Sequence, residues 1–377
     1  MQFRDLKAQY QKLKNKIDPA IIDVNTNCNF IMGKQVKELE EQLADYVGVK
    51  HCITCGNGTD ALYMAMLVWG IGKNDAVFVP DFTFFSSGEI VSLAGATPIF
   101  VDVDGETFNI DPNLLEKQII KVQNEGKLVP KAIVAVDLFG LPADLNAIRK
   151  IADKYGMYLL EDGAQGFGGE IEGRRACSFG DISTTSFFPA KPVGCYGDGG
   201  AVFTNDDEWA MLLESYRVHG KGENKYDNIR IGLNSRLDTV QAAILKIKLD
   251  AFTEFERDDI NKIALLYDEA LGDLVKIPVI REGYLSSWAQ YTIQLENNLK
   301  RDGLQLFLKN QGIPTMIYYQ KPMHKQDAFI NNNYEYADND FYVTNRLCTT
   351  VLSLPMHPYL TEKDINNVAN SIRNFLG

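Results

Sequence analysis

Short apolar segments alternate with amphipathic ones over residues 51–204, and this alternation constrains the fold more than any other feature. The apolar segments are short enough for strands, and the segments between them have helical spacing. Strands joined through helices pair in parallel, and a parallel sheet needs helices on both faces. We therefore predict an α/β fold with a mostly parallel sheet. The predicted strands are 51–55, 76–80, 97–103, 131–138, 157–161, 182–188 and 200–204.

The pattern changes near residue 234, where long helical stretches at 235–252 and 255–271 replace the alternation. Shorter strand and helix segments follow to the C-terminus. A chain of 377 residues usually forms about two domains. We predict a large domain over residues 1–250 and a smaller α/β domain over 251–377, joined by a long helix.

The composition argues against several kinds of partner. The formal net charge is −12, whereas binding to nucleic acid phosphates requires a basic face. The apolar runs end well before the ~20 residues that span a bilayer, and the N-terminal residues 1–7 include charges where a signal peptide would be apolar. We expect a cytoplasmic protein that binds neither nucleic acid nor membrane.

A metal centre is also not expected. The six cysteines are too few for a disulfide framework in a chain of this length. Cys52 and Cys55 form a CxxC pair beside His51, but structural zinc needs four ligands and no second pair follows. We interpret these two cysteines as buried thiols of a strand.

Residues 57–62 (NGTDAL) join a predicted strand to a predicted helix. A helix start offers free N–H groups and a partial positive charge, so Gly58 and Thr59 suit a phosphate. Thr59 could instead only cap the helix. Gly56, Gly58 and Ala61 also fit GxGxxA, with Asp81 about 20 residues later, which leaves a nicotinamide dehydrogenase as an alternative.

Asp162 follows an apolar strand, so we expect it at the carboxyl end of the sheet, where open α/β folds bind ligands. A buried aspartate there needs a cationic partner, and a protonated pyridine nitrogen would serve. Gln165, one turn later, could reach the phenolic oxygen of such a ring. For an isolated aspartate, capping of a turn is the alternative.

Lys191 lies between Pro189 and Pro192, among apolar and small residues. A lysine in such a segment is either a surface residue or a desolvated amine with a lowered pKa, and the second kind forms Schiff bases. Ser186, on the preceding predicted strand, could hold a phosphate.

In combination, these segments resemble the DegT/DnrJ/EryC1/StrS family of nucleotide-sugar aminotransferases over nearly the whole chain. The resemblance implies an aspartate aminotransferase-like (fold type I) fold and pyridoxal 5'-phosphate (PLP) as cofactor. The matching segments are NGTDAL (57–62), FTF (82–84), EDGAQ (161–165), SFFPAK (186–191), GDGG (197–200), GLNSRLDTVQAAIL (232–245), GIPTMIYYQKPMH (312–324) and LSLPMHPYL (352–360).

The resemblance implies a role for each matching residue. Lys191 resembles the lysine that binds the cofactor aldehyde, Asp162 the partner of the ring nitrogen, and Gln165 that of the ring hydroxyl. Phe84 takes the position of the aromatic residue that covers the ring. The residues that look like phosphate ligands are Gly58, Thr59, Ser186 and, from the neighbouring subunit of a homodimer, Asn234.

Substrate contacts follow less directly from the motifs. The resemblance places Arg236 near the substrate, and Tyr318 stands where a histidine is common in the family. Tyr226 and His324 are further candidates, each of which could equally be solvent-facing or packed. Two other departures are small: Ala190 replaces an expected serine, and Gly163 replaces a usual alanine.

The implied reaction moves an amino group from L-glutamate to a keto-sugar carried by a nucleotide, for surface glycan or natural-product sugars. The NSRLD stretch (234–238) resembles the branch that aminates C3, in particular of UDP-2-acetamido-2-deoxy-3-oxo-glucuronate, and a dTDP-linked 3-keto-6-deoxyhexose is the runner-up. Alternatives are a sugar dehydratase of the same fold, which carries histidine at the position of Lys191, a non-catalytic regulator, and the dehydrogenase above.

Overall fold

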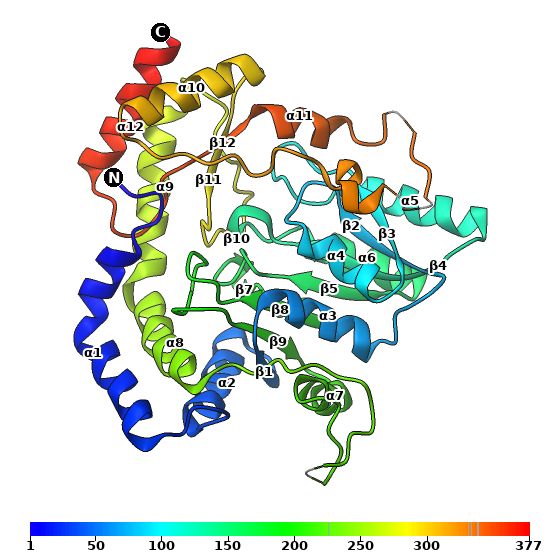
Figure 1. Cartoon of the computed structure of the whole chain (residues 1–377). Coiled ribbons are helices and arrows are strands. Elements are labelled where there is room, and N and C mark those ends of the chain that lie inside the picture. The colour runs from blue at the N-terminus through cyan, green and yellow to red at the C-terminus, as the bar shows by residue number, and fades with distance from the viewer. Residues whose placement is uncertain (225, 331, 333, 338) are drawn as a thin grey trace.

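The computed structural model describes residues 1–377 except 225, 331, 333 and 338. Within the described residues, a seven-stranded sheet is built from β1 (His51–Cys55), β2 (Asp75–Pro80), β3 (Thr97–Val101), β4 (Val129–Val136), β5 (Tyr158–Asp162), β8 (Ile182–Ser186) and β9 (Gly200–Thr204). Their order is β1-β9-β8-β5-β4-β2-β3 (Figure 1). Neighbouring strands are parallel except where β9 pairs antiparallel with β1 and β8. The predicted α/β fold with a mostly parallel sheet is confirmed.

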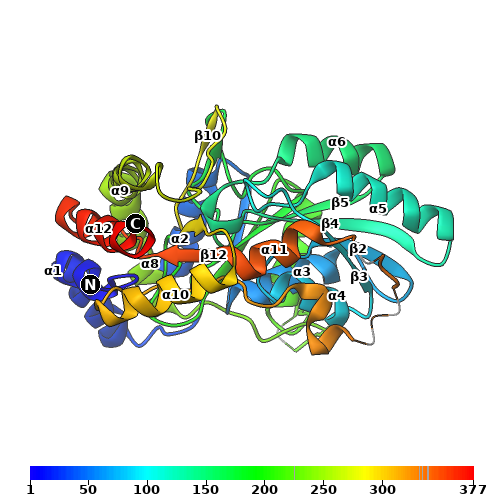
Figure 2. The ribbon, with the colours of Figure 1, turned by 90° about the horizontal axis from the view of Figure 1, so that it is seen from above.

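Helices cover both faces of the sheet because its strands are apolar on both sides. In β2, Val77 and Val79 pack into one hydrophobic cluster, and Ala76 and Phe78 pack into another. Figure 2 shows helices on the two sides of the sheet. One face carries α3 (Gly58–Val68), α4 (Ser86–Leu93) and α7 (Asp207–Arg217), and the other carries α2 (Lys34–Val47), α5 (Pro112–Glu125), α6 (Leu145–Tyr155) and α8 (Thr239–Ala251).

A single long rod takes the place of the two helices predicted at 235–252 and 255–271. Helix α8 continues through a π-helical turn, Phe252–Glu256, into α9 (Arg257–Leu271). The rod stays unbroken because both Phe252 and Arg257 keep right-handed helical backbone angles. The proposed boundary between residues 250 and 251 therefore lies inside a continuous helix.

The C-terminal part of the chain has an apolar cluster of its own, which includes Tyr267 of the rod and Ile293. Around it lie the two strands of a small antiparallel sheet and two helices. A separate three-stranded sheet has the order β10-β6-β7. The elements are β6 (Glu170–Ile171), β7 (Arg174–Arg175), β10 (Tyr284–Leu285), β11 (Tyr291–Gln294), α10 (Asn298–Asn310), α11 (Tyr342–Thr350), β12 (Val351–Leu354) and α12 (Glu362–Leu376).

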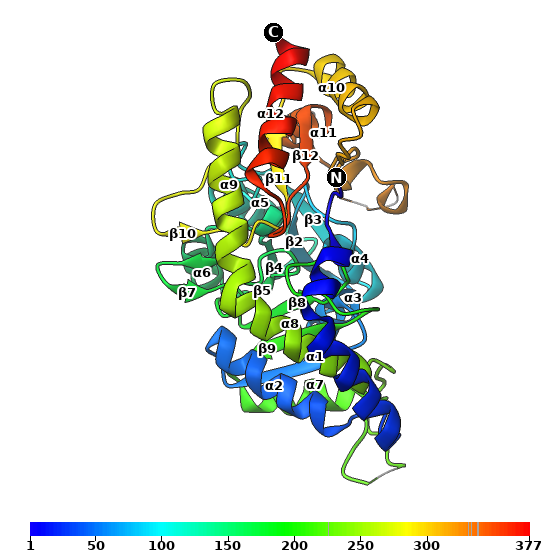
Figure 3. The same ribbon diagram turned by 90° about the vertical axis from the view of Figure 1, so that its left-hand side faces the viewer.

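Helix α1 (Leu6–Asn27), which the sequence analysis did not predict, runs along α8 (Figure 3). Leu13 and Ile17 of α1 pack with Ile244 and Ala251. The apolar stripe of α1 is thin and the helix contains Pro19, so its helical periodicity is weak.

The described residues contain neither a candidate membrane span nor a cluster of metal-ligating side chains. In this part of the chain, no helix has both the length and the apolar character needed to cross a membrane. Across the same residues, no three His, Cys, Asp or Glu side chains gather as a metal site. Cys52 and Cys55 are buried thiols of β1, as the sequence indicated.

Candidate active site

The carboxyl ends of the parallel strands border a cavity of about 430 Å³. Small-molecule sites have volumes of roughly 300–1,000 Å³, and open parallel sheets bind their ligands at this edge. The cavity is lined by residues that follow β1, β2, β5 and β8, together with residues close to the C-terminal sheet. The predicted site residues that line it are Gly58, Thr59, Phe84, Asp162, Gln165, Ser186, Lys191 and Tyr318.

Lys191 is half-buried in the turn that follows β8. Its backbone N–H donates to the Phe188 carbonyl at 2.9 Å, and its carbonyl accepts from Arg4 Nη2 at 3.0 Å. Burial lowers the pKa of the Lys191 amine, the Asp162 carboxylate opposes this effect, and the Arg4 charge adds to it. A lysine with a lowered pKa is more often neutral, so it is a better nucleophile and proton acceptor.

Asp162 is the last residue of β5 and is buried. Its Oδ2 accepts from the Ser87 hydroxyl at 2.9 Å, and its Oδ1 accepts from the Ala164 N–H at 3.2 Å. Burial raises the pKa of Asp162, whereas the Ser87 and Ala164 hydrogen bonds and the Lys191 charge lower it. The two donors orient the carboxylate and leave it able to face a cation in the cavity. Sequence reasoning missed Ser87, since nothing local links it to Asp162.

The turn from β1 into α3 packs tightly against the end of β8. The Asn57 side chain caps α3 by accepting from the Asp60 N–H at 2.8 Å, so the helix begins at Gly58. A Cβ at Gly58 would lie 2.7 Å from the Cβ of Ser186, so only glycine allows this approach. The positive end of α3 and the hydroxyls of Thr59 and Ser186 therefore line the same end of the cavity.

Gln165 and Phe84 lie on the cavity wall with Tyr319, which sequence reasoning missed. The Gln165 side-chain oxygen accepts from the Phe139 N–H at 2.7 Å, and its nitrogen donates to the Tyr319 hydroxyl at 3.1 Å. Phe84 is 56% exposed, and its ring centroid lies 6.3 Å from that of Tyr319. Tyr319 stands next to Tyr318 in the YYQ segment, which was the one available signal for it.

The departure at Gly163 has a physical reason. A Cβ at this position would lie 2.3 Å from the Cys177 sulfur and 3.1 Å from the Thr184 carbonyl oxygen. The thiol of Cys177 therefore occupies the space that an alanine side chain at position 163 would need. Ala190, the second departure, lines the cavity beside Lys191.

His324 does not line the cavity, and its role as a substrate contact stays a prediction. Its Nδ1 lies 2.6 Å from the Asp81 Oδ2, and its ring stacks on Phe341 with centroids 4.1 Å apart. Asp81 is fully buried in this pair and also accepts from the backbone N–H of His324. The dinucleotide interpretation required a free Asp81 carboxylate, but this carboxylate is hydrogen-bonded to His324. Asp81 and His324 are far apart in sequence, so their pairing is visible only in the three-dimensional structure.

Three other predicted residues also lie off this cavity. Tyr226 is 86% exposed and lines a different hollow together with His219 and Arg230. Asn234 is exposed, and Arg236 is half-buried with no hydrogen-bond partner for its Nε among the described residues. The structure of a single chain therefore brings none of the three to Lys191, and their roles stay predictions.

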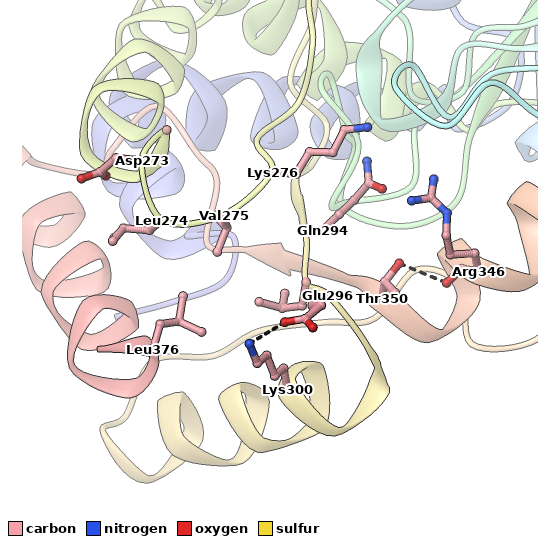
Figure 4. A pocket seen from close by; sticks show the side chains of 12 residues that line it. Asp273, Leu274, Val275, Lys276, Gln294, Glu296, Lys300, Arg346, Thr350 and Leu376 are labelled. Atoms are coloured by element: carbon pink, nitrogen blue, oxygen red, sulfur yellow. Dashed lines mark hydrogen bonds and ion pairs between the residues drawn. The ribbon is translucent and has the colours of Figure 1, made fainter.

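A further hollow of about 480 Å³ lies in the C-terminal part of the chain (Figure 4). Lys276, Gln294 and Arg346 line it, as does the ion pair of Glu296 with Lys300 at 2.5 Å. This second hollow contains no predicted site residue, and it does not place a lysine with a buried carboxylate. The 430 Å³ cavity at the edge of the sheet is therefore the better candidate for catalysis.

Comparison with known proteins identifies the family. The DegT/DnrJ/EryC1/StrS aminotransferase family model matches residues 11–373. The chain belongs to this family. A Pseudomonas aeruginosa member named UDP-2-acetamido-2-deoxy-3-oxo-D-glucuronate aminotransferase is 43% identical over 99% of this chain and 100% of its own length. A Geobacillus stearothermophilus member named pleiotropic regulatory protein is 41% identical over 98% of this chain and 97% of its own.

Two solved structures have the same fold. A DegT/DnrJ/EryC1/StrS aminotransferase from Brucella abortus is 48% identical, covers 100% of both chains and superposes with a TM-score of 0.97. NtdA from Bacillus subtilis, solved with bound cofactor PMP, is 26% identical, covers 97% of this chain and 82% of its own, and has a TM-score of 0.86. The predicted fold type I architecture and PLP cofactor are confirmed.

The cavity has the chemistry that PLP requires. Lys191 offers an amine for the aldehyde, and Asp162 offers a buried carboxylate for the ring nitrogen. The start of α3 and two hydroxyls suit the phosphate. The protein is a PLP-dependent transaminase, and the dehydrogenase and dehydratase alternatives are set aside.

Proposed function

We propose that this transaminase moves an amino group from L-glutamate to C3 of a nucleotide-linked 3-keto sugar, with UDP-2-acetamido-2-deoxy-3-oxo-glucuronate as the preferred acceptor. The observation that carries the proposal is one cavity lined by Lys191, Asp162 and the start of α3. The Pseudomonas aeruginosa relative, similar over its full length, supports the choice of sugar. A dTDP-linked 3-keto-6-deoxyhexose is the second candidate.

Each residue around the cavity has a distinct task in this proposal. When bound, PLP supplies an electron sink for charge that develops at the amino-bearing carbon. Lys191 accepts a proton from that carbon of the donor and returns one to the sugar carbon, as a general base and acid. Asp162 keeps a negative charge beside the ring nitrogen, and Ser87 orients this carboxylate. Gly58, Thr59 and Ser186 would hold the phosphate, and Gln165 would contact the ring hydroxyl.

Phe84 and Tyr318 exclude water from the reacting atoms in this proposal, since both line the cavity. Arg236 and Tyr226 would meet the nucleotide sugar once a second subunit is present.

Asn234 is exposed and does not line the cavity of its own chain, which supports its predicted contact with the phosphate of a neighbouring subunit. A homodimer with shared active sites follows from this assignment, and a cytoplasmic location stays a prediction.

Incubation of the PLP-loaded protein with glutamate and a panel of keto nucleotide-sugars tests this function. We expect 2-oxoglutarate to form together with an amino sugar of the expected mass, most rapidly from the UDP-linked 3-keto uronate. Lys191→Ala is expected to abolish both the visible absorption of bound PLP and the turnover. Lys37→Ala, which removes a lysine whose side chain is 81% exposed, is the matched control.

Two outcomes would contradict the proposal. Full turnover by Lys191→Ala would exclude the assigned base. Binding of a nucleotide sugar without amination of any sugar in the panel would favour a regulatory role, which the name of the Geobacillus stearothermophilus relative suggests.

A further inference from the structure

The first residues of the chain lie between the turn that carries Lys191 and the C-terminal segment. Arg4 Nη2 donates to the Lys191 carbonyl at 3.0 Å, across 187 positions of sequence. The Met356 N–H donates to the Phe3 carbonyl at 3.1 Å, and the Phe3 ring meets Tyr318 edge-on with centroids 6.3 Å apart. Figure 3 shows the N-terminus beside β12 and α12. The N-terminal segment thus contacts the Lys191 turn, the cavity wall and the C-terminal part.

The guanidinium of Arg4 has no direct counter-charge. Among the described residues, Arg4 forms no ion pair within 4.0 Å, and its Nη1 is buried without a hydrogen-bond partner. The acid that faces it, Glu256, is buried and is engaged by the Gln9 amide at 2.9 Å and by the Tyr359 hydroxyl. Burial lowers the pKa of Arg4 and the Glu256 carboxylate opposes this effect, so Glu256 acts on Arg4 through space and not in a direct ion pair.

The remaining titratable groups near Arg4 do not neutralise it. Burial lowers the pKa of His357 to about 4, so this histidine is neutral at physiological pH. Burial also lowers the pKa of Lys248, which is 1% exposed, to about 8, so this lysine is still mostly protonated at neutral pH and its charge has the same sign as that of Arg4. The groups that face Arg4 are thus Glu256, Tyr359, His357, Lys248 and Lys191.

We propose that Arg4 is a positioning residue for the cofactor lysine: its guanidinium holds the backbone of the Lys191 turn and keeps a fixed positive charge beside the amine. The inference rests on the proposed function, in which Lys191 binds the PLP aldehyde. No predicted role or family motif assigned a task to Arg4.

The electrostatics of the amine agree with this geometry. Two charged groups face Lys191, namely Asp162 from β5 and Arg4 from the N-terminal segment. Asp162 raises the pKa of the lysine, and Arg4 lowers it in addition to burial. An amine condenses with an aldehyde, with loss of water, only in its unprotonated form. Arg4 therefore opposes the effect of Asp162 and increases the unprotonated, reactive fraction of Lys191.

The test is the rate at which PLP-free protein takes up PLP, followed by visible absorption over a range of pH. Arg4→Gln and Arg4→Met remove the charge, and Arg4→Lys keeps it. Lys7→Gln, on the exposed face of the same N-terminal region, is the matched control. The unfolding temperature of each variant is recorded, and having two neutral variants covers the case in which one fails to fold.

We expect the neutral variants to load PLP roughly three- to tenfold more slowly at pH 7, with the midpoint of the pH profile moved upward by about half to one unit. Arg4→Lys and Lys7→Gln should stay within about twofold of the wild-type rate. Neutral variants that load like the wild type would overturn the inference, as would equal slowing in Arg4→Lys. If the wild-type protein itself gave no visible band with PLP, the proposed function would fail instead.

Discussion

At the scale of single residues, Ser87 is the clearest addition to the predicted site. It lies on α4 and donates to Asp162 at 2.9 Å, and this hydrogen bond lowers the pKa of the carboxyl. In Ser87→Ala that stabilisation of the charged form is lost, so the pKa of Asp162 rises. The acidic limb of the rate–pH profile should then move to higher pH by about one unit, because a hydrogen bond to a charged group contributes roughly 1.5–3 kcal/mol.

The measurement is the pH dependence of turnover with glutamate for Ser87→Ala, with Ser92→Ala, an exposed serine of the same helix, as the control. An unshifted acidic limb in Ser87→Ala would show that Asp162 does not control the rate through its charge.

At the scale of elements, the contact between the start of α3 and the end of β8 shapes one end of the cavity. Gly58→Ala would place a Cβ 2.7 Å from the Cβ of Ser186 and force the two elements apart. We expect PLP affinity to fall by roughly tenfold or more and stability to fall by about 1–3 kcal/mol, the usual effect of overpacking. Spectroscopic titration with PLP and denaturant unfolding measure the two effects.

Gly72→Ala is the matched control, since its Cβ would meet only the Ala94 carbonyl at 3.7 Å. Wild-type PLP affinity in Gly58→Ala would mean that the phosphate does not bind at this end of the cavity.

The elements also show why some segments were predictable and others were not. The strands of the central sheet were found from sequence because they are apolar on both faces and are punctuated by turns. Helices α1, α7 and α11 were missed, since an amphipathic surface helix such as α1 carries only a thin apolar stripe. The rod of α8 and α9 was divided in two because a π-helical turn, Phe252–Glu256, shifts the helical periodicity.

At the scale of the whole molecule, the proposed homodimer predicts complementation between inactive subunits. A 1:1 mixture of Lys191→Ala and Asn234→Ala chains, unfolded and refolded together, would form mixed dimers with one intact site. We expect about a quarter of wild-type activity to return, since half of the dimers are mixed and half of their sites are intact. Size measurement by light scattering checks that dimers form.

Each variant refolded alone serves as the control and should stay well below the activity of the mixture. If mixing restored nothing although dimers formed, Asn234 would act within its own subunit or not at all.

The sequence by itself determined the parallel sheet and the motifs at its carboxyl edge, because strand periodicity and strand-end residues such as Asp162 are local properties. Only the tertiary structure decided which side chains, distant in sequence, form hydrogen bonds with the residues of these motifs. Ser87 reaches Asp162 across 75 positions and Arg4 reaches Lys191 across 187, and His324 is taken up by Asp81 instead of the cavity. Such hydrogen bonds require approach to about 3 Å, which packing alone brings about and no local spacing encodes.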